Sequence, residues 1–155
     1  SQVAIPTDKV DEEYLTSPRP WNIKSIKKFM FIFGPLSSIF DFITYGVLLF
    51  IFHASRDLFH TGWFLESLCT QTMVIHIIRT GKIPFVESRP SKSLLLVSLL
   101  IVITGLVAPF SPLAKPFGFV APPFLYFVTI MLIVIVYLFS AQMVKKRFVK
   151  KYGYD

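Results

Sequence analysis

The sequence predicts an all-α membrane protein with four transmembrane helices. Four apolar runs, each about as long as a bilayer-spanning helix, follow one another along the 155-residue chain. Apolar residues make up 54% of the sequence, and its mean hydropathy of +0.62 is well above what is usual for soluble domains. The basic residues lie in short groups just outside the apolar runs, as juxtamembrane charges do. The net charge of +7 therefore indicates membrane orientation and not binding to nucleic acid.

Residues 1–28 are expected to form the end of a preceding transmembrane helix, a cytoplasmic linker and an interfacial segment. The apolar opening ends at Pro6, which suits the last turn of a helix, so we expect the chain to begin partway through a longer protein. An acidic stretch follows, without the spacing and turn glycine of a calcium-binding loop: Asp8, Asp11, Glu12 and Glu13. We interpret it as a solvated linker that leads to Trp21 at headgroup depth.

Residues 29–155 are expected to form the membrane domain, with spans at about 29–52, 59–78, 93–110 and 123–144 and a basic C-terminal tail. At roughly 100° per residue, the polar residues of the first span share one face, and Pro35 should kink the helix. These residues are Gly34, Ser37, Ser38, Asp41, Thr44 and Tyr45. The second span differs, because its polar residues point in three directions. We therefore expect other helices to surround the second span, and we expect the Leu-rich third span to face lipid.

The distribution of basic residues predicts the topology. The segments before the first span, between the second and third spans, and after the fourth span are strongly basic. The other two connections hold one basic residue each, Arg56 and Lys115. By the positive-inside rule, both termini lie in the cytoplasm and two short hairpins face the outside.

Two carboxylates within the predicted spans are the candidates for a metal site. Asp41 lies near the middle of the first span and Glu66 lies within the second. Carboxylates with nearby hydroxyl and amide oxygens are ligands that Mg²⁺ and Ca²⁺ prefer, and the expected supporting groups are Ser38, Gln71 and Thr70. The competing interpretation is that each carboxyl group only holds helices together through hydrogen bonds, which average about 0.6 kcal/mol within membranes.

The other potentially reactive residues, histidines and a cysteine, are better explained by structural roles. His76 could relay protons near the cytoplasmic end of its span, although a hydrogen bond to a neighbouring helix is the commoner role. His53 and His60 lack a third clustered ligand for zinc, and Cys69 in its apolar run is typical of an inert packing residue. No phosphate-binding glycine loop, nucleophile elbow or metalloprotease motif is present, so the segment alone should have no catalytic activity.

The motifs, taken in order, resemble a known family. The runs SQVAIP, RPW, FGPLSSIFDFITY, GWFLESLCTQTMVIHIIRTGKIPF and SRPS are similar to the C-terminal membrane part of magnesium-transporting P-type ATPases. The resemblance implies that SQVAIP ends the sixth transmembrane helix and that the four spans are helices seven to ten. It also implies that ATP phosphorylates an Asp of a DKTGT motif elsewhere in the pump, and that this step drives Mg²⁺ into the cytoplasm across the cell (plasma or inner) membrane.

In that family the cation sites draw mainly on helices four to six, and in related pumps the eighth helix can add a carboxylate, which makes Glu66 a candidate. The acidic segment from Asp8 to Glu13 would help to couple the phosphorylation domain to the membrane. The partners of the whole chain would be the remaining helices and cytoplasmic domains of the same pump, together with lipid. The alternative function is a free-standing four-helix channel subunit or membrane assembly factor, with a soluble helical bundle as a more distant third.

Overall fold

The structure is a computed structural model that describes residues 8–9 and 23–153 of the chain. The described part is helical and contains no strand beyond an isolated bridge between Pro84 and Ser88. Its long helices are α2 (Ile23–Gly46), α3 (Arg56–Ile78), α4 (Lys92–Val107) and α6 (Phe124–Tyr152). Shorter elements are the π-helical turn η2 (Val47–Ile51), the 3₁₀ turn η3 (Ala108–Phe110) and α5 (Ala114–Phe117). The expected all-α class is confirmed for this part.

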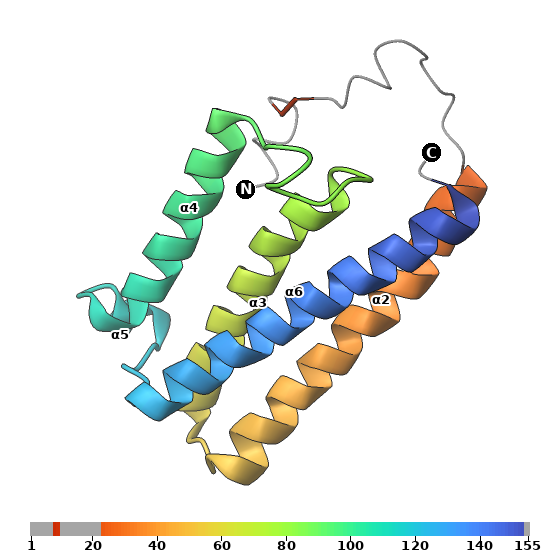
Figure 1. Ribbon diagram of the computed structural model, residues 1–155. Helices are drawn as coiled ribbons and strands as arrows, with labels where there is room; N and C mark the ends of the chain where they lie inside the picture. Colours follow the sequence, from red (N-terminus) through yellow and green to blue (C-terminus); the bar gives the residue numbers. More distant parts are fainter. Residues whose placement is uncertain (1–7, 10–22, 154–155) are drawn as a thin grey trace.

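Helix α3 lies at the centre of the arrangement (Figure 1). Helix α6 packs along both α3 and α2, and α4 packs against α3. The start of α2, the end of α6 and the α3–α4 loop lie toward the same end of the molecule. The three segments that the sequence marks as basic are therefore gathered at one end.

The main hydrophobic core lies where α3 and α6 meet. Its buried members from these two helices are Leu65, Cys69, Tyr126, Ile130 and Val134, and Leu48 of η2 joins them. Gly62 permits the close approach, because a Cβ there would lie 2.2 Å from the Tyr126 hydroxyl oxygen. That hydroxyl donates a hydrogen bond of 2.7 Å to the carbonyl oxygen of Leu58.

Local sequence signals account for several element boundaries. The hydroxyl oxygens of Ser55 and Ser91 accept hydrogen bonds from the amides of Leu58 and Leu94, capping α3 and α4. Gly118 ends α5 with φ of +67°, a left-handed conformation that costs glycine little. Helix α5 lies within the outer hairpin that the sequence predicts between the third and fourth spans.

Helix α2 carries two departures from regular α-helical hydrogen bonding. Pro35 lies inside the helix and cannot donate a backbone hydrogen bond, and the π-helical turn η2 continues the helix after Gly46. Asp41 lies between these two points.

Three described helical segments are long and apolar enough to cross a membrane: Ile26–Ile51, Lys92–Phe110 and Phe124–Tyr152. Many of their large apolar side chains are exposed, which suits contact with lipid. Helix α3 has 23 residues but is not one of the three, because its polar residues lower its hydropathy. The count of four spans and the cytoplasmic termini therefore stay predictions.

Candidate functional site

Glu66 is buried on α3, the helix that contacts α2, α4 and α6. Its side chain is 1% exposed, and its Oε1 atom finds no hydrogen-bond partner among the described residues. Its Oε2 atom accepts one long hydrogen bond, of 3.4 Å, from the hydroxyl of the neighbouring Ser67. A buried polar atom without a partner is rare in proteins because it loses its hydration without compensation. Glu66 therefore has unused capacity to bind a proton, a cation or a group from another helix.

Asp41 of α2 lies near enough to Glu66 for the two carboxyl groups to interact electrostatically. Asp41 is only partly buried, whereas Glu66 is almost wholly enclosed. The two candidates from separate predicted spans thus lie within electrostatic range of each other.

Tyr137 of α6 completes the surroundings of this carboxylate pair, by which we mean Asp41 and Glu66. Its hydroxyl lies near Ser37 and within electrostatic range of both carboxyl groups. The ring packs edge-on against Phe40, with centroids 5.3 Å apart. Thr44, one turn after Phe40, is fully buried, and its hydroxyl oxygen has no hydrogen-bond partner in the described chain. Three helices, α2, α3 and α6, therefore contribute polar groups to the surroundings of the carboxylate pair.

The expected supporting residues do not form the shell that the sequence indicates. Ser38 and Gln71 are exposed, and neither forms a hydrogen bond with the carboxylate pair in the described structure. Thr70 bonds the backbone carbonyl oxygens of Glu66 and Ser67, at 2.9 and 3.2 Å, and not a carboxyl oxygen. Ser38 and Gln71 remain available to groups outside this segment.

His76 belongs to a different environment. It is 2% exposed, and its ring lies beside that of Phe85 in the α3–α4 loop, with centroids 5.2 Å apart. Neither ring nitrogen finds a hydrogen-bond partner among the described residues. The interhelical hydrogen bond expected for His76 is therefore not present in the described part.

The chemistry of the carboxylate pair suits a hard cation, because its donors are oxygens. Within the described residues there is no group of three or more His, Cys, Asp or Glu side chains that could hold a metal. The pair could thus supply only part of a Mg²⁺ coordination shell. Water or oxygens from other helices would have to complete it, as is common for Mg²⁺.

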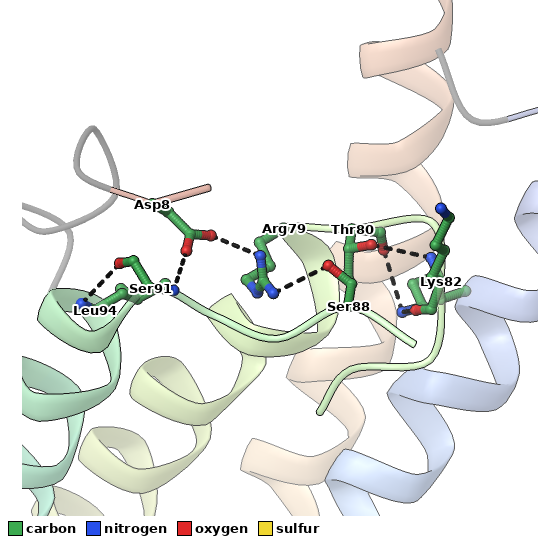
Figure 2. Close-up of polar contacts among 8 residues, drawn as sticks. Asp8, Arg79, Thr80, Lys82, Ser88, Ser91 and Leu94 are labelled. Atoms are coloured by element: carbon green, nitrogen blue, oxygen red, sulfur yellow. Dashed lines mark hydrogen bonds and ion pairs between the residues drawn. The ribbon is translucent and has the colours of Figure 1, made fainter. Parts of the chain in front are cut away.

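A second polar cluster, the loop anchor, fixes the α3–α4 loop and consists of Asp8, Arg79, Ser88 and Ser91 (Figure 2). Arg79 Nη1 donates to Asp8 Oδ2 at 2.7 Å, and Nη2 donates to the Ser88 hydroxyl oxygen at 3.1 Å. Asp8 Oδ1 accepts the backbone amide of Ser91 at 2.7 Å. The Arg79 and Asp8 side chains are only 5% and 10% exposed. Asp8 therefore ties the segment before α2 to the junction of α3 and α4.

Asp8 is the only acidic residue of the predicted coupling segment that the structure describes. Asp11, Glu12 and Glu13 lie outside the described residues. The contacts of Asp8 show where this one acidic residue meets the helices.

Lys145 fastens α6 to the same loop from the other side. Its ammonium group is buried, with the side chain 1% exposed. It donates to three backbone carbonyl oxygens, those of Ile77 at 3.0 Å, Thr80 at 3.2 Å and Lys82 at 2.7 Å. These carbonyls belong to the C-terminal end of α3 and the residues after it, where helices leave carbonyls unpaired and favour positive charge.

Sequence reasoning missed Tyr137 and Lys145 as site residues, whereas it placed Thr44 on the same polar face as Asp41. Tyr137 is one aromatic residue among many in the fourth apolar run, and Lys145 begins a basic group otherwise made of exposed side chains. The available signal for Lys145 was its place immediately after the last apolar residue of that run.

Comparison with known protein families identifies the class of membrane protein. Residues 1–147 match the family described as cation transporting ATPase, C-terminus. Because the match covers nearly the whole chain, the chain belongs to this family.

Comparison with individual proteins shows which members of this family the chain resembles. The chain is 41% identical over 159 residues to a protein of Salmonella typhimurium named magnesium-transporting ATPase, P-type 1, and 40% identical over 159 residues to the Escherichia coli K12 protein of that name. Each comparison covers 100% of this chain and 18% of the relative. A further Salmonella typhimurium protein of the same name is 41% identical over 157 residues. The chain thus corresponds to the C-terminal part of magnesium-transporting P-type ATPases.

Proposed function

We propose that this segment supports the transport core of an ATP-driven magnesium importer and that the carboxylate pair contributes to the cation path. The observation that carries the proposal is the buried, unpartnered Oε1 of Glu66 beside Asp41. An ionisable group at membrane depth usually faces a bundle interior or an ion path. The names of the relatives supply the ion, Mg²⁺.

ATP hydrolysis would take place in cytoplasmic domains of the full-length pump, with ATP and Mg²⁺ as their cofactors. The remaining helices and domains of the same pump are the expected partners of this segment. The exposed side chains of Ser38 and Gln71 support this, because polar groups at membrane depth favour contact with other helices over lipid.

We infer four spans, with α3 as the second, and both ends of the segment in the cytoplasm of a plasma or inner membrane. The gathering of the basic segments at one end supports this topology under the positive-inside rule. Single cysteines at exposed Lys92 and Lys115, in a pump whose native cysteines are replaced, should react with a membrane-impermeant thiol reagent from opposite sides. Labelling of both from the same side would overturn the topology.

The acidic segment from Asp8 to Glu13 is proposed to couple the phosphorylation domain to the membrane helices. The bonds from Asp8 to Arg79 and Ser91 support this, because they give the segment a fixed attachment to α3 and α4. A movement of the segment would therefore be transmitted to the end of the helix that carries Glu66.

Charge-neutral replacements test the role of the carboxylate pair. Asp41→Asn and Glu66→Gln in the full-length pump should raise the Mg²⁺ concentration for half-maximal ATPase activity and uptake by at least about tenfold, because a charged oxygen ligand is lost. Ser140→Ala is the matched control, since its hydroxyl only bonds the Val136 carbonyl within its own helix. Normal apparent affinity with lowered stability would show that the carboxyl groups are structural.

A free-standing channel subunit or assembly factor is not favoured, because the whole chain aligns with 17–18% of much longer pumps. Mg²⁺ flux through the isolated segment in liposomes without ATP would revive that alternative.

A further inference from the structure

Two neighbouring cavities lie at the end of the bundle opposite the loop anchor. The head cavity, of about 680 Å³, is lined by Tyr45, Arg56, Asp57, Phe59, His60, Trp63, Phe117 and Gly118. The tail cavity, of about 420 Å³, lies between α3 and α4 and is lined by Phe64, Leu68, Leu100, Ile101, Thr104, Gly105, Ala108, Leu113, Phe117 and Phe119. Both volumes fall within the roughly 300–1,000 Å³ typical of small-molecule sites.

Aromatic rings join the two cavities. Phe117 lines both, and its ring stacks on that of Phe119, with centroids 6.0 Å apart. The ring centroid of Phe119 in turn lies 5.3 Å from that of His60 in the head cavity and 4.6 Å from that of Phe64 in the tail cavity. The two cavities are therefore adjacent, with the ring of Phe117 on the border that they share.

The chemistry changes from one cavity to the other. The head cavity holds a cation and an anion on adjacent residues, Arg56 and Asp57, whose side chains are exposed. Neither forms an ion pair with another residue of the described chain. In the tail cavity, Thr104 is the only lining residue with a polar side chain. An occupant should thus have a charged end and a long apolar end.

The charges of the head cavity also select the kind of headgroup. A guanidinium group binds phosphate oxygens well, and a carboxylate pairs with an ammonium group. The rings of Tyr45, Phe59 and Trp63 pack together there, with centroids 5.3 to 6.3 Å apart, and aromatic faces also attract ammonium groups. Because Arg56 is the only Lys or Arg in the lining, Asp57 balances its charge and leaves no excess for an anionic headgroup.

We propose that the two cavities together bind one zwitterionic glycerophospholipid. Arg56 contacts its phosphate, Asp57 and the neighbouring rings contact its ammonium group, and one acyl chain lies between α3 and α4. The site goes beyond the support of cation transport and rests on the placement of α3 and α4 in the membrane. Under the topology proposed above, it lies in the outer leaflet.

Native mass spectrometry of the full-length pump can count the bound lipids. The pump is purified from mixed micelles of phosphatidylethanolamine and phosphatidylglycerol with identical acyl chains. The wild type should retain one phosphatidylethanolamine in preference to phosphatidylglycerol. Arg56→Gln and Asp57→Asn should each weaken its retention about tenfold, the loss expected for one charge-assisted hydrogen bond. Lys115→Gln is the control, because that exposed charge lines neither cavity.

A phosphatidylethanolamine with a photoactivatable group in the middle of one acyl chain reports on the tail cavity. Crosslinks should map to α3 or α4 peptides that contain tail-cavity residues. Thr104→Phe, which fills the cavity from an exposed position, should reduce them, whereas Leu96→Phe on the exposed part of α4 should not. Equal retention of the two lipids, or crosslinks unchanged by Thr104→Phe, would overturn the proposal. Neither readout depends on Mg²⁺ transport, so failure of the proposed function would leave this test intact.

Discussion

The C-terminal end of α3 and the middle of the same helix remove charged groups from water in two different ways. At the C-terminal end, Asp8 and Arg79 pair with each other, and Lys145 meets three carbonyl oxygens. In the middle, Glu66 keeps an unpartnered oxygen beside a second carboxyl group. In the first arrangement each charged group has a partner, although the Nε atom of Arg79 has none among the described residues, and this arrangement is expected to hold the fold. The second leaves capacity unused, which a purely structural site would not require.

Replacing Lys145 should have the largest effect on stability. Lys145→Met keeps much of the side-chain volume but leaves three carbonyl oxygens without their ammonium donor, and should cost about 4 kcal/mol. The apparent melting temperature of the purified pump would fall accordingly. Lys146→Met, at the exposed neighbouring position, should change it little. Similar melting temperatures for the two variants would show that the buried ammonium is not an anchor.

Breaking the loop anchor should have the next largest effect. Asp8→Ala leaves the buried guanidinium of Arg79 without its carboxylate and uncaps the Ser91 amide, at a cost of about 2–3 kcal/mol. A double-mutant cycle with Arg79→Met measures the pair directly. If the effects of the two changes on stability simply add, Asp8 and Arg79 are not energetically coupled.

Glu66→Gln should affect stability much less than either change at the C-terminal end of α3. The carboxyl group has one long hydrogen bond to lose, so the cost should stay within about 1 kcal/mol, close to the average of membrane hydrogen bonds. The test is to measure melting temperature and Mg²⁺ affinity on the same preparation. A large loss of stability with unchanged Mg²⁺ affinity would show that Glu66, like the residues at the C-terminal end of α3, has a structural role.

Thr44→Val should have the smallest effect. Its hydroxyl is fully buried without a partner, and valine has nearly the same shape, so stability should change by no more than about 0.5 kcal/mol. A clear loss of stability would indicate that the hydroxyl binds a group outside the described residues. A fall in Mg²⁺ affinity alone would place Thr44 in the cation path.

The sequence predicted the long helices well because their signals are local. The length of each apolar run predicted the spans, and the serine caps and Pro123 that the structure shows at helix starts also act within a few residues of each boundary. The central position of α3 also followed from its polar residues, which point in three directions and are costly in lipid.

The side-chain partners depended on long-range packing and were less accessible. Asp41 and Glu66 were predicted from the cost of burying charge and from helical phase, and so were their expected partners Ser38 and Gln71, which are exposed in the described chain. Tyr137 reaches the pair from a helix about 70 positions after Glu66. Neither periodicity nor composition predicts which face of α6 packs against the part of α3 that carries Glu66.

The two interruptions in α2 have a mechanical consequence for Asp41. Pro35 removes one backbone hydrogen bond before it, and the π-helical turn at Val47–Ile51 rearranges the bonds after it. The helical turn that carries Asp41 thus lies between two interruptions of regular α-helical hydrogen bonding. The contacts of Lys145 and Arg79, by contrast, anchor the C-terminal end of α3, the helix that carries Glu66. Small torsional motions of α2 would therefore change the distance between the carboxyl groups of Asp41 and Glu66 while α3 keeps its position.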